Sequence, residues 1–374
     1  MRAALAERRA RDLASEPWTP RPAEGRARPR RVAVGDPQAP LAVFLRVLDR
    51  HGLLGPDGWL ANDVELVSIG DHFDFGGSDQ RESAARDGLA IAIWLASHPA
   101  DQVTLIAGNH DLARVGELAP FDDATFDRVH AQAVAAYRNG EPDPAAERAL
   151  CQAYPSLATA EVAARDFSAF CSAQRDLVWA LLRAQRLPLA YAASARLLFC
   201  HAGVTREHLA AVGAAEGCDA RHAARALNGA LDAAVARHAG GALEIAALHR
   251  PGSFARGEGG GMLYHRPAHP DLPKNQGHGA SSELGRRFDP RGLPRGLTQV
   301  VGHIGDAKCR ELLGPWAEGE PVPGELRHLH TDGASVRYAG GLPPGDERDA
   351  SATLIFIDGL MNRTPVESYA VFEW

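Results

Sequence analysis

The sequence has little cysteine, no long apolar run and no excess of positive charge. Its five cysteines form no CxxC pair and are odd in number, which argues against a disulfide framework or a cysteine zinc site and fits a reducing compartment. No apolar run approaches the roughly 18 residues of a membrane span. The first 31 residues lack the apolar stretch of a secretory signal. We therefore expect a cytoplasmic protein without membrane contact.

The charge balance also limits the class of partner. The net charge of −7 argues against a broad nucleic-acid surface. The 374 residues are 45% hydrophobic and 23% charged, which is ordinary for a globular chain. Residues 1–30 are rich in arginine, alanine and proline, so we expect a mobile N-terminal extension that contains a short helix. A small patch for an acidic partner is the alternative interpretation of this extension.

Short β-rich segments alternate with helical patterns, and this predicts an α/β fold. The first three expected strands are separated by helical segments at 40–52 and 81–98, so their sheet should be mostly parallel, with its loops on one edge. The expected strands are residues 31–34, 64–69, 103–107, 196–200, 297–301 and 351–357.

Two long segments interrupt this rhythm. Residues 112–195 are alanine-rich and helical, without a strand signal, and we interpret them as an inserted helical cap. Residues 250–296 are dense in glycine, proline, histidine and arginine, which predicts a long irregular loop. Loops of that length are usually functional or disordered, so we place this one at the active site. We expect its histidines His265, His269 and His278 to be solvated.

Polar side chains follow five of the expected strands, most of them next to glycine. Ligands of open α/β sheets bind at the carboxyl ends of strands, and these side chains are oxygen and nitrogen donors that Mn²⁺, Fe and Zn²⁺ accept. A pair of metal ions needs one bridging carboxylate and several terminal ligands. The candidates are Asp36, Gln38, Asp71, Asp74, Asn109, His110, His201 and His303.

These motifs, in this order, resemble the calcineurin-like metallophosphoesterases, most of all the bacterial-type phosphoprotein phosphatase branch. The resemblance implies a β-sandwich flanked by helices (α/β/β/α) over residues 31–374. The terminal Ile357-Asp358-Gly359 extends it nearly to the end of the chain. The motifs that carry it are Gly35-Asp36-Pro37-Gln38, Gly70-Asp71-His72-Phe73-Asp74, Gly108-Asn109-His110-Asp111, His201-Ala202-Gly203 and Val300-Val301-Gly302-His303.

The resemblance also implies a ligand set for two divalent metal ions. The ligands would be Asp36 and Gln38 for the first ion, Asn109, His201 and His303 for the second, and Asp71 for both. The family usually has histidine where this chain has Gln38. Because an amide oxygen is a harder ligand than imidazole, we expect a shift from Zn²⁺ towards Mn²⁺ or Mg²⁺; Mn²⁺ is favoured, and Fe, Zn²⁺ and Mg²⁺ are the alternatives. The alternative for Gln38 is that it does not bind the metal itself but contacts a residue that does.

The catalytic roles follow from the same resemblance. His110 would protonate the leaving oxygen, with Asp74 orienting its imidazole. A histidine near its usual pKa of about 6.5 suits this task. We expect His72, between the two motif aspartates, to pack on the sheet.

One motif departs from the family. Phe75 stands where phosphoprotein phosphatases commonly have an arginine that grips the substrate phosphate. Arg266 is the first candidate for the missing phosphate-binding arginine, and Arg250 and Arg256 are the next candidates. The alternative is that all three are ordinary solvated arginines.

The sequence therefore predicts a metal-dependent hydrolase of phosphate esters. A phosphomonoesterase resembling serine/threonine protein phosphatases, acting on phosphoproteins or small phosphorylated molecules, is the first hypothesis. A nucleotide or dinucleoside polyphosphate hydrolase or phosphodiesterase is the alternative among enzymes. The alternative of another class is a non-catalytic module that binds a metal or a phosphate at a decayed site.

Overall fold

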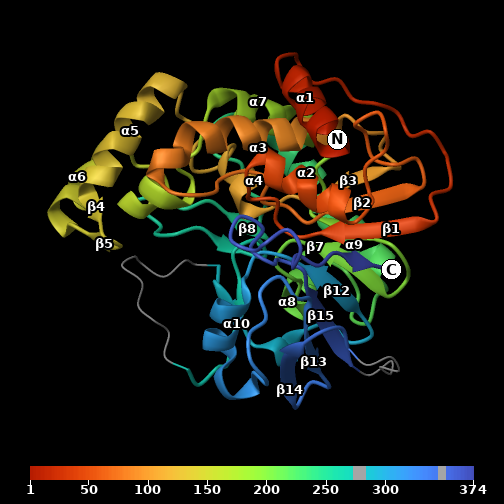
Figure 1. Ribbon diagram of the computed structural model, residues 1–374. Helices are drawn as coiled ribbons and strands as arrows, with labels where there is room; N and C mark the ends of the chain where they lie inside the picture. The colour runs from red at the N-terminus through yellow and green to blue at the C-terminus, as the bar shows by residue number, and fades with distance from the viewer. Residues whose placement is uncertain (273–283, 344–350) are drawn as a thin grey trace.

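Two larger sheets lie face to face, and helices cover their outer sides (Figure 1). The structure, a computed structural model, describes residues 1–272, 284–343 and 351–374. The first sheet has the order β16-β1-β2-β3, with strands Phe372–Glu373, Arg30–Val34, Val64–Ser68 and Val103–Leu105. The second has the order β14-β13-β15-β12-β7-β6, with strands Val336–Gly340, Arg327–Thr331, Ala352–Phe356, Thr298–Val301, Leu197–Cys200 and Ala190–Ala192.

The central strands of both sheets run parallel. Strand β2 pairs in parallel with β1 and β3, and β12 pairs in parallel with β7 and β15. The antiparallel strands β16, β6, β13 and β14 complete the edges. The predicted α/β sandwich is confirmed, and its parallel strands bring the polar residues after them to neighbouring places.

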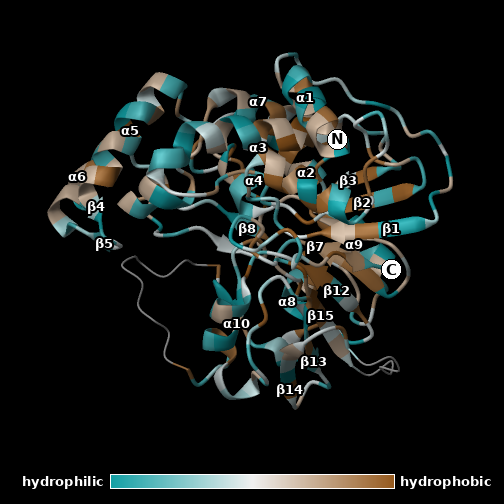
Figure 2. Cartoon of the chain, in the orientation of Figure 1, coloured by the Kyte–Doolittle hydropathy of each residue, from teal (hydrophilic) through white to brown (hydrophobic). Residues whose placement is uncertain are grey.

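The side chains of each central strand alternate between the core that lies between the two sheets and the core that lies under the helices. In β1, Ala33 packs between the sheets with Phe199 of β7 and Ile355 of β15, whereas Val32 and Val34 pack under the helices. Successive side chains of a strand point to opposite faces, so each central strand contributes to both layers. Figure 2 shows the resulting apolar colouring of the inner strands.

The helices form the outer layers. Helices α1, α2 and α3 pack against one another beside the first sheet, α7 joins α3 to α9, and α9 contacts β6 and β7. Among the described residues no helix is both long and apolar enough to cross a membrane. The bounds are α1 Arg2–Ala14, α2 Leu41–Arg50, α3 Arg81–Ala96, α4 Asn109–Ala113, α7 Ser172–Arg183, α8 Arg206–Ala211, α9 Ala220–Arg237 and α10 Asp306–Leu313.

The N-terminal segment differs from the mobile extension that we expected over residues 1–30. Helix α1 packs against α2 and α3, and Ala6 and Ala10, four residues apart on one face, are fully buried. Downstream, Arg28 is buried and donates to the carbonyl of Asp101. Small alanine side chains let the helix approach closely, so an arginine-rich helix still has a packing face.

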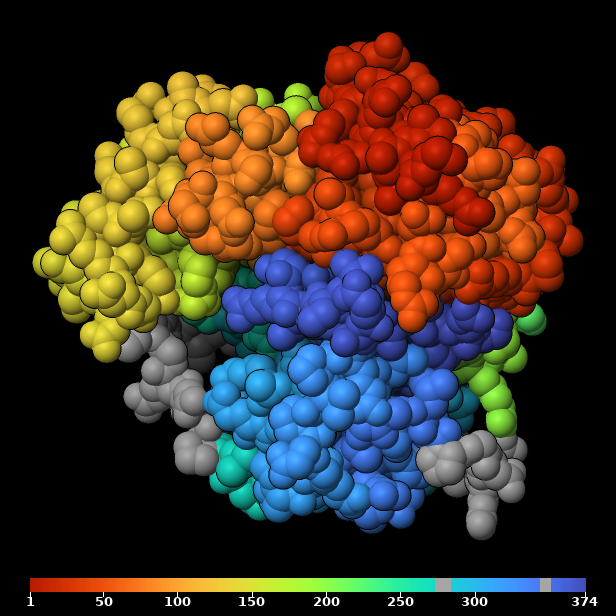
Figure 3. Space-filling view, in the orientation of Figure 1, coloured from red at the N-terminus to blue at the C-terminus, as the bar shows by residue number. Residues whose placement is uncertain are grey.

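The expected cap contains a separate apolar core. Helices α5 (Asp123–Ala136) and α6 (Pro144–Ala153), the hairpin β4 (Tyr137–Arg138)–β5 (Glu141–Pro142) and the π-turn Val162–Asp166 pack around this core, and their yellow atoms form one end of the molecule in Figure 3. Part of the expected range 112–195 lies elsewhere. Helix α7 and strand β6 belong to the sandwich, since β6 pairs with β7.

The long segment 250–296 is less irregular than expected. It includes strands β9 (Gly260–Gly261), β10 (Arg266–Pro267) and β11 (Arg287–Phe288), and β8 (His249–Arg250) opens it. His265 is buried, so the expectation that it is solvated is wrong. Residues 273–283, with His278, lie outside the described residues.

The buried His98 makes stability depend on pH. Its Nδ1 donates to the carbonyl of Trp94 and its Nε2 accepts from the amide of Leu60, which is the bonding of a neutral ring. Burial lowers the pKa of His98 to about 3. In the unfolded chain the imidazole takes up a proton below about pH 6.5, whereas in the folded chain it stays neutral. The free energy of unfolding therefore falls by roughly 1.4 kcal/mol between pH 7.5 and pH 5.5.

Urea unfolding at pH 7.5 and 5.5 measures this loss. We expect His98→Gln to lose less free energy of unfolding than the parent between the two pH values, whatever its stability at pH 7.5. His222→Gln is the matched control, because the His222 side chain is 66% exposed. Equal pH dependence in the parent and His98→Gln would contradict the assignment.

Candidate metal centre

Five loops deliver the candidate ligands to one end of the two sheets. Asp36 follows β1, Asp71 follows β2, Asn109 opens α4 after β3, His201 follows β7 and His303 follows β12. The strands are parallel, so these loops meet at one edge, where ligands of such sheets bind. The sequence pattern that located the strands therefore also located this cluster.

The turns that carry these residues are tight. Asp71 and His303 have the left-handed φ values of 53° and 66°, which cost free energy in residues other than glycine and cluster at functional sites. A Cβ at Gly108 would lie 2.1 Å from Asp71 Oδ1, and one at Gly302 would lie 1.9 Å from Asp36 Oδ1. Glycine is required at both positions because backbone and carboxylate nearly touch.

Asp71, His201 and His303 form a buried group with the donor set of a metal site. His201 Nε2 lies 3.4 Å from Asp71 Oδ2 and 3.1 Å from His303 Nδ1. Asn109 Oδ1 lies 3.1 Å from the same Nε2. Polar atoms of Asp71, His303 and Asn109, each from a different loop, thus lie within 3.4 Å of His201 Nε2.

The hydrogen bonds of His201 direct its Nε2 into the cluster. Its Nδ1 lies 2.8 Å from the carbonyl of Ile69 and donates to it, so Nε2 faces the oxygens of Asp71 and Asn109, which are acceptors. Burial opposes a charge on this ring, but the carboxylate of Asp71 outweighs it and raises the pKa of His201. A proton on Nε2 or a metal ion makes both contacts favourable, so the residues fit a metal ion when Nε2 is deprotonated.

Asp36 and Gln38 lie beside this group. The Oδ2 atom of Asp36 accepts the amide of His303 at 2.9 Å, and its Oδ1, although buried, has no partner among the described residues. Burial and the neighbouring carboxylates of Asp358 and Asp71 raise the pKa of Asp36 well above its usual range. Gln38 Nε2 donates to the carbonyl of Phe73 at 3.0 Å, which orients the amide and leaves its oxygen as the atom that can serve as a ligand.

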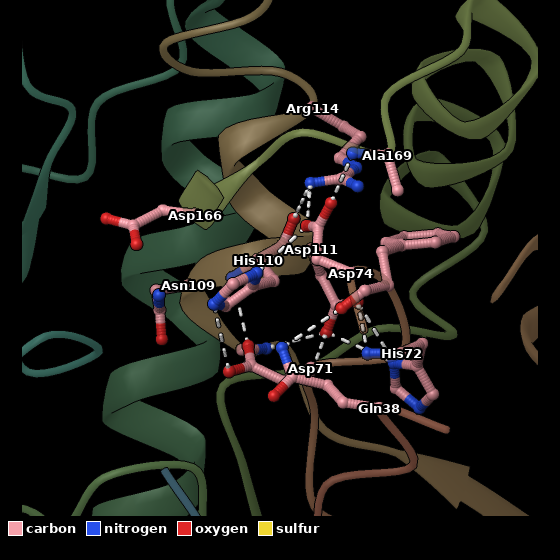
Figure 4. Close-up of polar contacts among 12 residues, drawn as sticks. Gln38, Asp71, His72, Asp74, Asn109, His110, Asp111, Arg114, Asp166 and Ala169 are labelled. Atoms are coloured by element: carbon pink, nitrogen blue, oxygen red, sulfur yellow. Dashed lines mark hydrogen bonds and ion pairs between the residues drawn. The ribbon is translucent and has the colours of Figure 1, made fainter. Parts of the chain in front are cut away.

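His110 and Asp74 form a hydrogen-bonded pair next to the cluster (Figure 4). Asp74 Oδ2 accepts from His110 Nδ1 at 2.9 Å, which leaves Nε2 on the side of Asp71, 3.8 Å from its Oδ2. Burial alone would lower the pKa of His110, but the carboxylates of Asp71 and Asp74 outweigh it and raise the pKa. The ring is thus held in one orientation, with Nε2 able to carry a proton toward the cluster.

Arg114 is a functional residue that the sequence interpretation missed. Its guanidinium is fully buried, donates to Asp74 Oδ2 at 2.7 Å and to Gln174 Oε1 at 3.0 Å, and lies over the ring of Phe73. One oxygen of Asp74 is therefore shared by His110 and Arg114. The sequence did contain a signal for this contact: His110 and Arg114 are four residues apart, which places them on the same face of a helix.

Asp111 is a second residue to which the sequence analysis assigned no role. Its carboxylate accepts the backbone amides of Gly108, Asp71 and His72 at 2.8 to 3.1 Å. It also contacts His72 Nδ1, while His72 Nε2 faces Ser68. His72 is thus buried away from the cluster, as we predicted, and Asp111 ties the loop after β2 to the start of α4.

The cap touches the pair of His110 and Asp74 directly. The backbone amide of Ala169 donates to Asp74 Oδ1 at 2.9 Å, and the ring of Phe167 meets that of His110 edge to face, with centroids 5.0 Å apart. Phe75, at the position where the resemblance leads us to expect an arginine, is buried against Ala84 and Ala169. An arginine at position 75 could reach the cluster only if the backbone of this loop followed a different course.

The three candidate arginines lie in different surroundings. Arg266 is half-buried in β10, where burial lowers the pKa of its guanidinium and the carboxylates of Asp166 and Asp71 oppose that shift. Arg256 pairs with Glu244 at the surface, and the structure does not bring it to the cluster. Arg250 is half-buried in β8.

Neither a protein-family model nor a curated protein matches the chain. Among solved structures, a serine/threonine phosphatase of Saccharomyces cerevisiae with similarity to human phosphatase PP5 aligns with 96% of this chain and 76% of its own, at 13% identity and a TM-score of 0.37. A cold-active protein tyrosine phosphatase aligns with 79% of this chain and 69% of its own, at 14% identity and a TM-score of 0.38. Likeness at this level carries no argument on fold or function, which rest on the chain's own residues.

The buried pair of Arg114 and Asp74 should contribute strongly to stability. Removing one partner of a buried ion pair leaves an unpaired charge and typically costs about 3–5 kcal/mol. We expect Arg114→Ala to lower the free energy of unfolding by that amount in urea titrations. The control is Arg165→Ala, which breaks an exposed pair with Asp166 and should cost about 1 kcal/mol or less; equal losses would contradict the interpretation.

Proposed function

We propose that this chain is a metal-dependent hydrolase of phosphate monoesters. The observation that carries the proposal is the convergence of Asp71, His201 and His303 beside the hydrogen-bonded pair of His110 and Asp74. A buried ligand group alone fits a structural metal. A partly exposed imidazole with an orienting carboxylate next to it fits proton transfer.

The proposed ligands are those that the loops bring together. In this proposal Asp71 is shared by two sets of ligands, Asp36 and Gln38 for one cation and Asn109, His201 and His303 for the other. When bound, two divalent cations supply activation of a water molecule at neutral pH and neutralisation of charge on the phosphoryl group. The amide oxygens of Gln38 and Asn109 favour Mn²⁺ or Mg²⁺ over softer ions.

His110 is the proposed general acid. Its Nδ1 is engaged by Asp74, so the proton that it can give to a leaving oxygen is on Nε2. The hydrogen bond of Nδ1 to the carboxylate of Asp74 favours the protonated ring, which is the form that can give a proton. Asp74 in turn is held by Arg114 and by the amide of Ala169, so it acts as a fixed orienting group.

Arg266 is the proposed phosphate-binding residue. Among the described residues its guanidinium has no hydrogen bond or ion pair, although the residue is half-buried and the carboxylate of Asp71 acts on its pKa. A guanidinium that is partly removed from water and has no partner gains free energy when an anion pairs with it. A phosphoryl group between Arg266 and the proposed cations would supply that anion.

Activity with metal is the first test. After EDTA treatment we expect no hydrolysis, and with Mn²⁺ restored we expect turnover of p-nitrophenyl phosphate and of at least one phosphopeptide or small monoester. The same screen includes diesters, nucleotides and dinucleoside polyphosphates, so it separates the monoesterase from its enzymatic alternatives. A Mn²⁺-loaded protein that hydrolyses none of these would overturn the proposed function in favour of a binding module.

Substitution of the proposed acid is the second test. His110→Ala should lower kcat by about 10²–10⁴, with the metal content unchanged by elemental analysis. The reduction should be smaller for an ester with a good leaving group such as p-nitrophenol, which needs less protonation. His222→Ala, at an exposed ring, serves as control; an unchanged kcat in His110→Ala would reject the assignment.

A further inference from the structure

A buried carboxylate outside the proposed catalytic groups joins two parts of the active-site wall. Glu117, in the turn after α4, accepts from the hydroxyl of Tyr264 at 2.8 Å and from the backbone amide of Gly252 at 2.7 Å, both on its Oε1. Both side chains are almost fully buried. The turn that follows the helix of Asn109 and His110 is thereby tied to the segment 249–266, which ends at Arg266.

The packing around this pair leaves little freedom. The ring of His249 stacks on that of Tyr264 with 8° between their planes, and a Cβ at Gly259 would lie 2.7 Å from Tyr264 Cζ and 2.9 Å from Glu117 Oε1. Glycine at 259 therefore lets the segment pass directly over the hydrogen bond. This tight contact fixes the distance between the segment 249–266 and the turn after α4.

The residues after Tyr264 transmit that position to Arg266. The amides of Tyr264 and His265 both donate to the carbonyl of Gly261, forming a tight turn. His265 Nε2 contacts the carbonyl of Gly203 at 3.0 Å, in the loop of His201. The amide of Arg266 then donates to the carbonyl of Arg286. Tyr264, His265 and Arg266 are thus bonded, one after the other, to the turn after α4, to the loop of His201 and to the residue before β11.

We infer that Tyr264 and Glu117 are positioning residues that hold Arg266 at the anion-binding place of the cluster. The inference rests on the proposed function, because it assigns to Arg266 the binding of a phosphoryl group. A side chain as long as arginine has many rotamers, and binding is stronger when its backbone is fixed beforehand. Tyr264 itself need not touch the substrate.

The test uses Tyr264→Phe in the full-length, Mn²⁺-loaded chain. The variant keeps the ring and removes only the hydroxyl, so we expect a rise in KM and in the Kd of inorganic phosphate of roughly three- to thirtyfold, with kcat changed much less and metal content unchanged. Tyr137→Phe is the matched control, because Tyr137 also donates to a glutamate, Glu161, in the cap. It should behave as the parent.

A double-mutant cycle distinguishes positioning from general stability. If Tyr264 acts through Arg266, Tyr264→Phe should add nothing to the loss caused by Arg266→Ala. Glu117→Gln keeps an acceptor for both bonds and should retain most of the affinity, whereas Gly259→Ala, which forces the pair apart, should reproduce the Tyr264→Phe effect. Additive losses, or a Tyr264→Phe variant equal to Tyr137→Phe, would overturn the inference.

The phosphate titration keeps this outcome separate from that of the proposed function. If the parent hydrolyses no ester but binds inorganic phosphate through Arg266, weaker binding in Tyr264→Phe still supports the positioning role while the hydrolase proposal fails. If the parent hydrolyses monoesters and its phosphate affinity is the same in Tyr264→Phe, the positioning role fails and the hydrolase proposal stands.

Discussion

The structure depends on one electrostatic constraint, the crowding of electron-rich atoms at the end of two sheets. The imidazole Nε2 of His201, the carboxylate of Asp71 and the amide oxygen of Asn109 face one another within 3.4 Å. Such acceptors repel unless a positive charge lies among them. The surrounding glycines and left-handed backbone positions oppose this repulsion, because they hold the loops where the side chains cannot move apart.

Buried hydrogen bonds provide much of that restraint. Asp111 binds three backbone amides of two loops, so the loop of Asp71 and the start of α4 move as one unit. Arg114 and Gln174 extend the network to the body of the protein and to the cap, since Gln174 donates to the carbonyls of Ala85 and Ala169. The orientation of His110 is therefore tied to the cap as well as to the sheets.

The sequence predicted the central strands and the clustering of the residues after them because both depend on local signals. A β-branched run ended by glycine marks a buried strand, and parallel strands share an edge whatever the loops between them do. Two features depended on tertiary packing and were not predicted: alanine positions give the arginine-rich start a face that packs on α2 and α3, and His265 is buried against His208 and Phe288. Strand β6 was missed although its partner β7 follows it in a short hairpin.

The assignment of an anion-binding arginine shows the same division between local and tertiary information. Phe75 stands where the resemblance leads us to expect an arginine, and the sequence ranks Arg266 ahead of Arg250 and Arg256 only weakly. The folded chain separates two of them: Arg256 pairs with Glu244 at the surface, whereas the half-buried Arg266 has no hydrogen bond or ion pair of its guanidinium among the described residues. An unpaired guanidinium has the most free energy to gain from an anion, and this is why we propose Arg266 for that role.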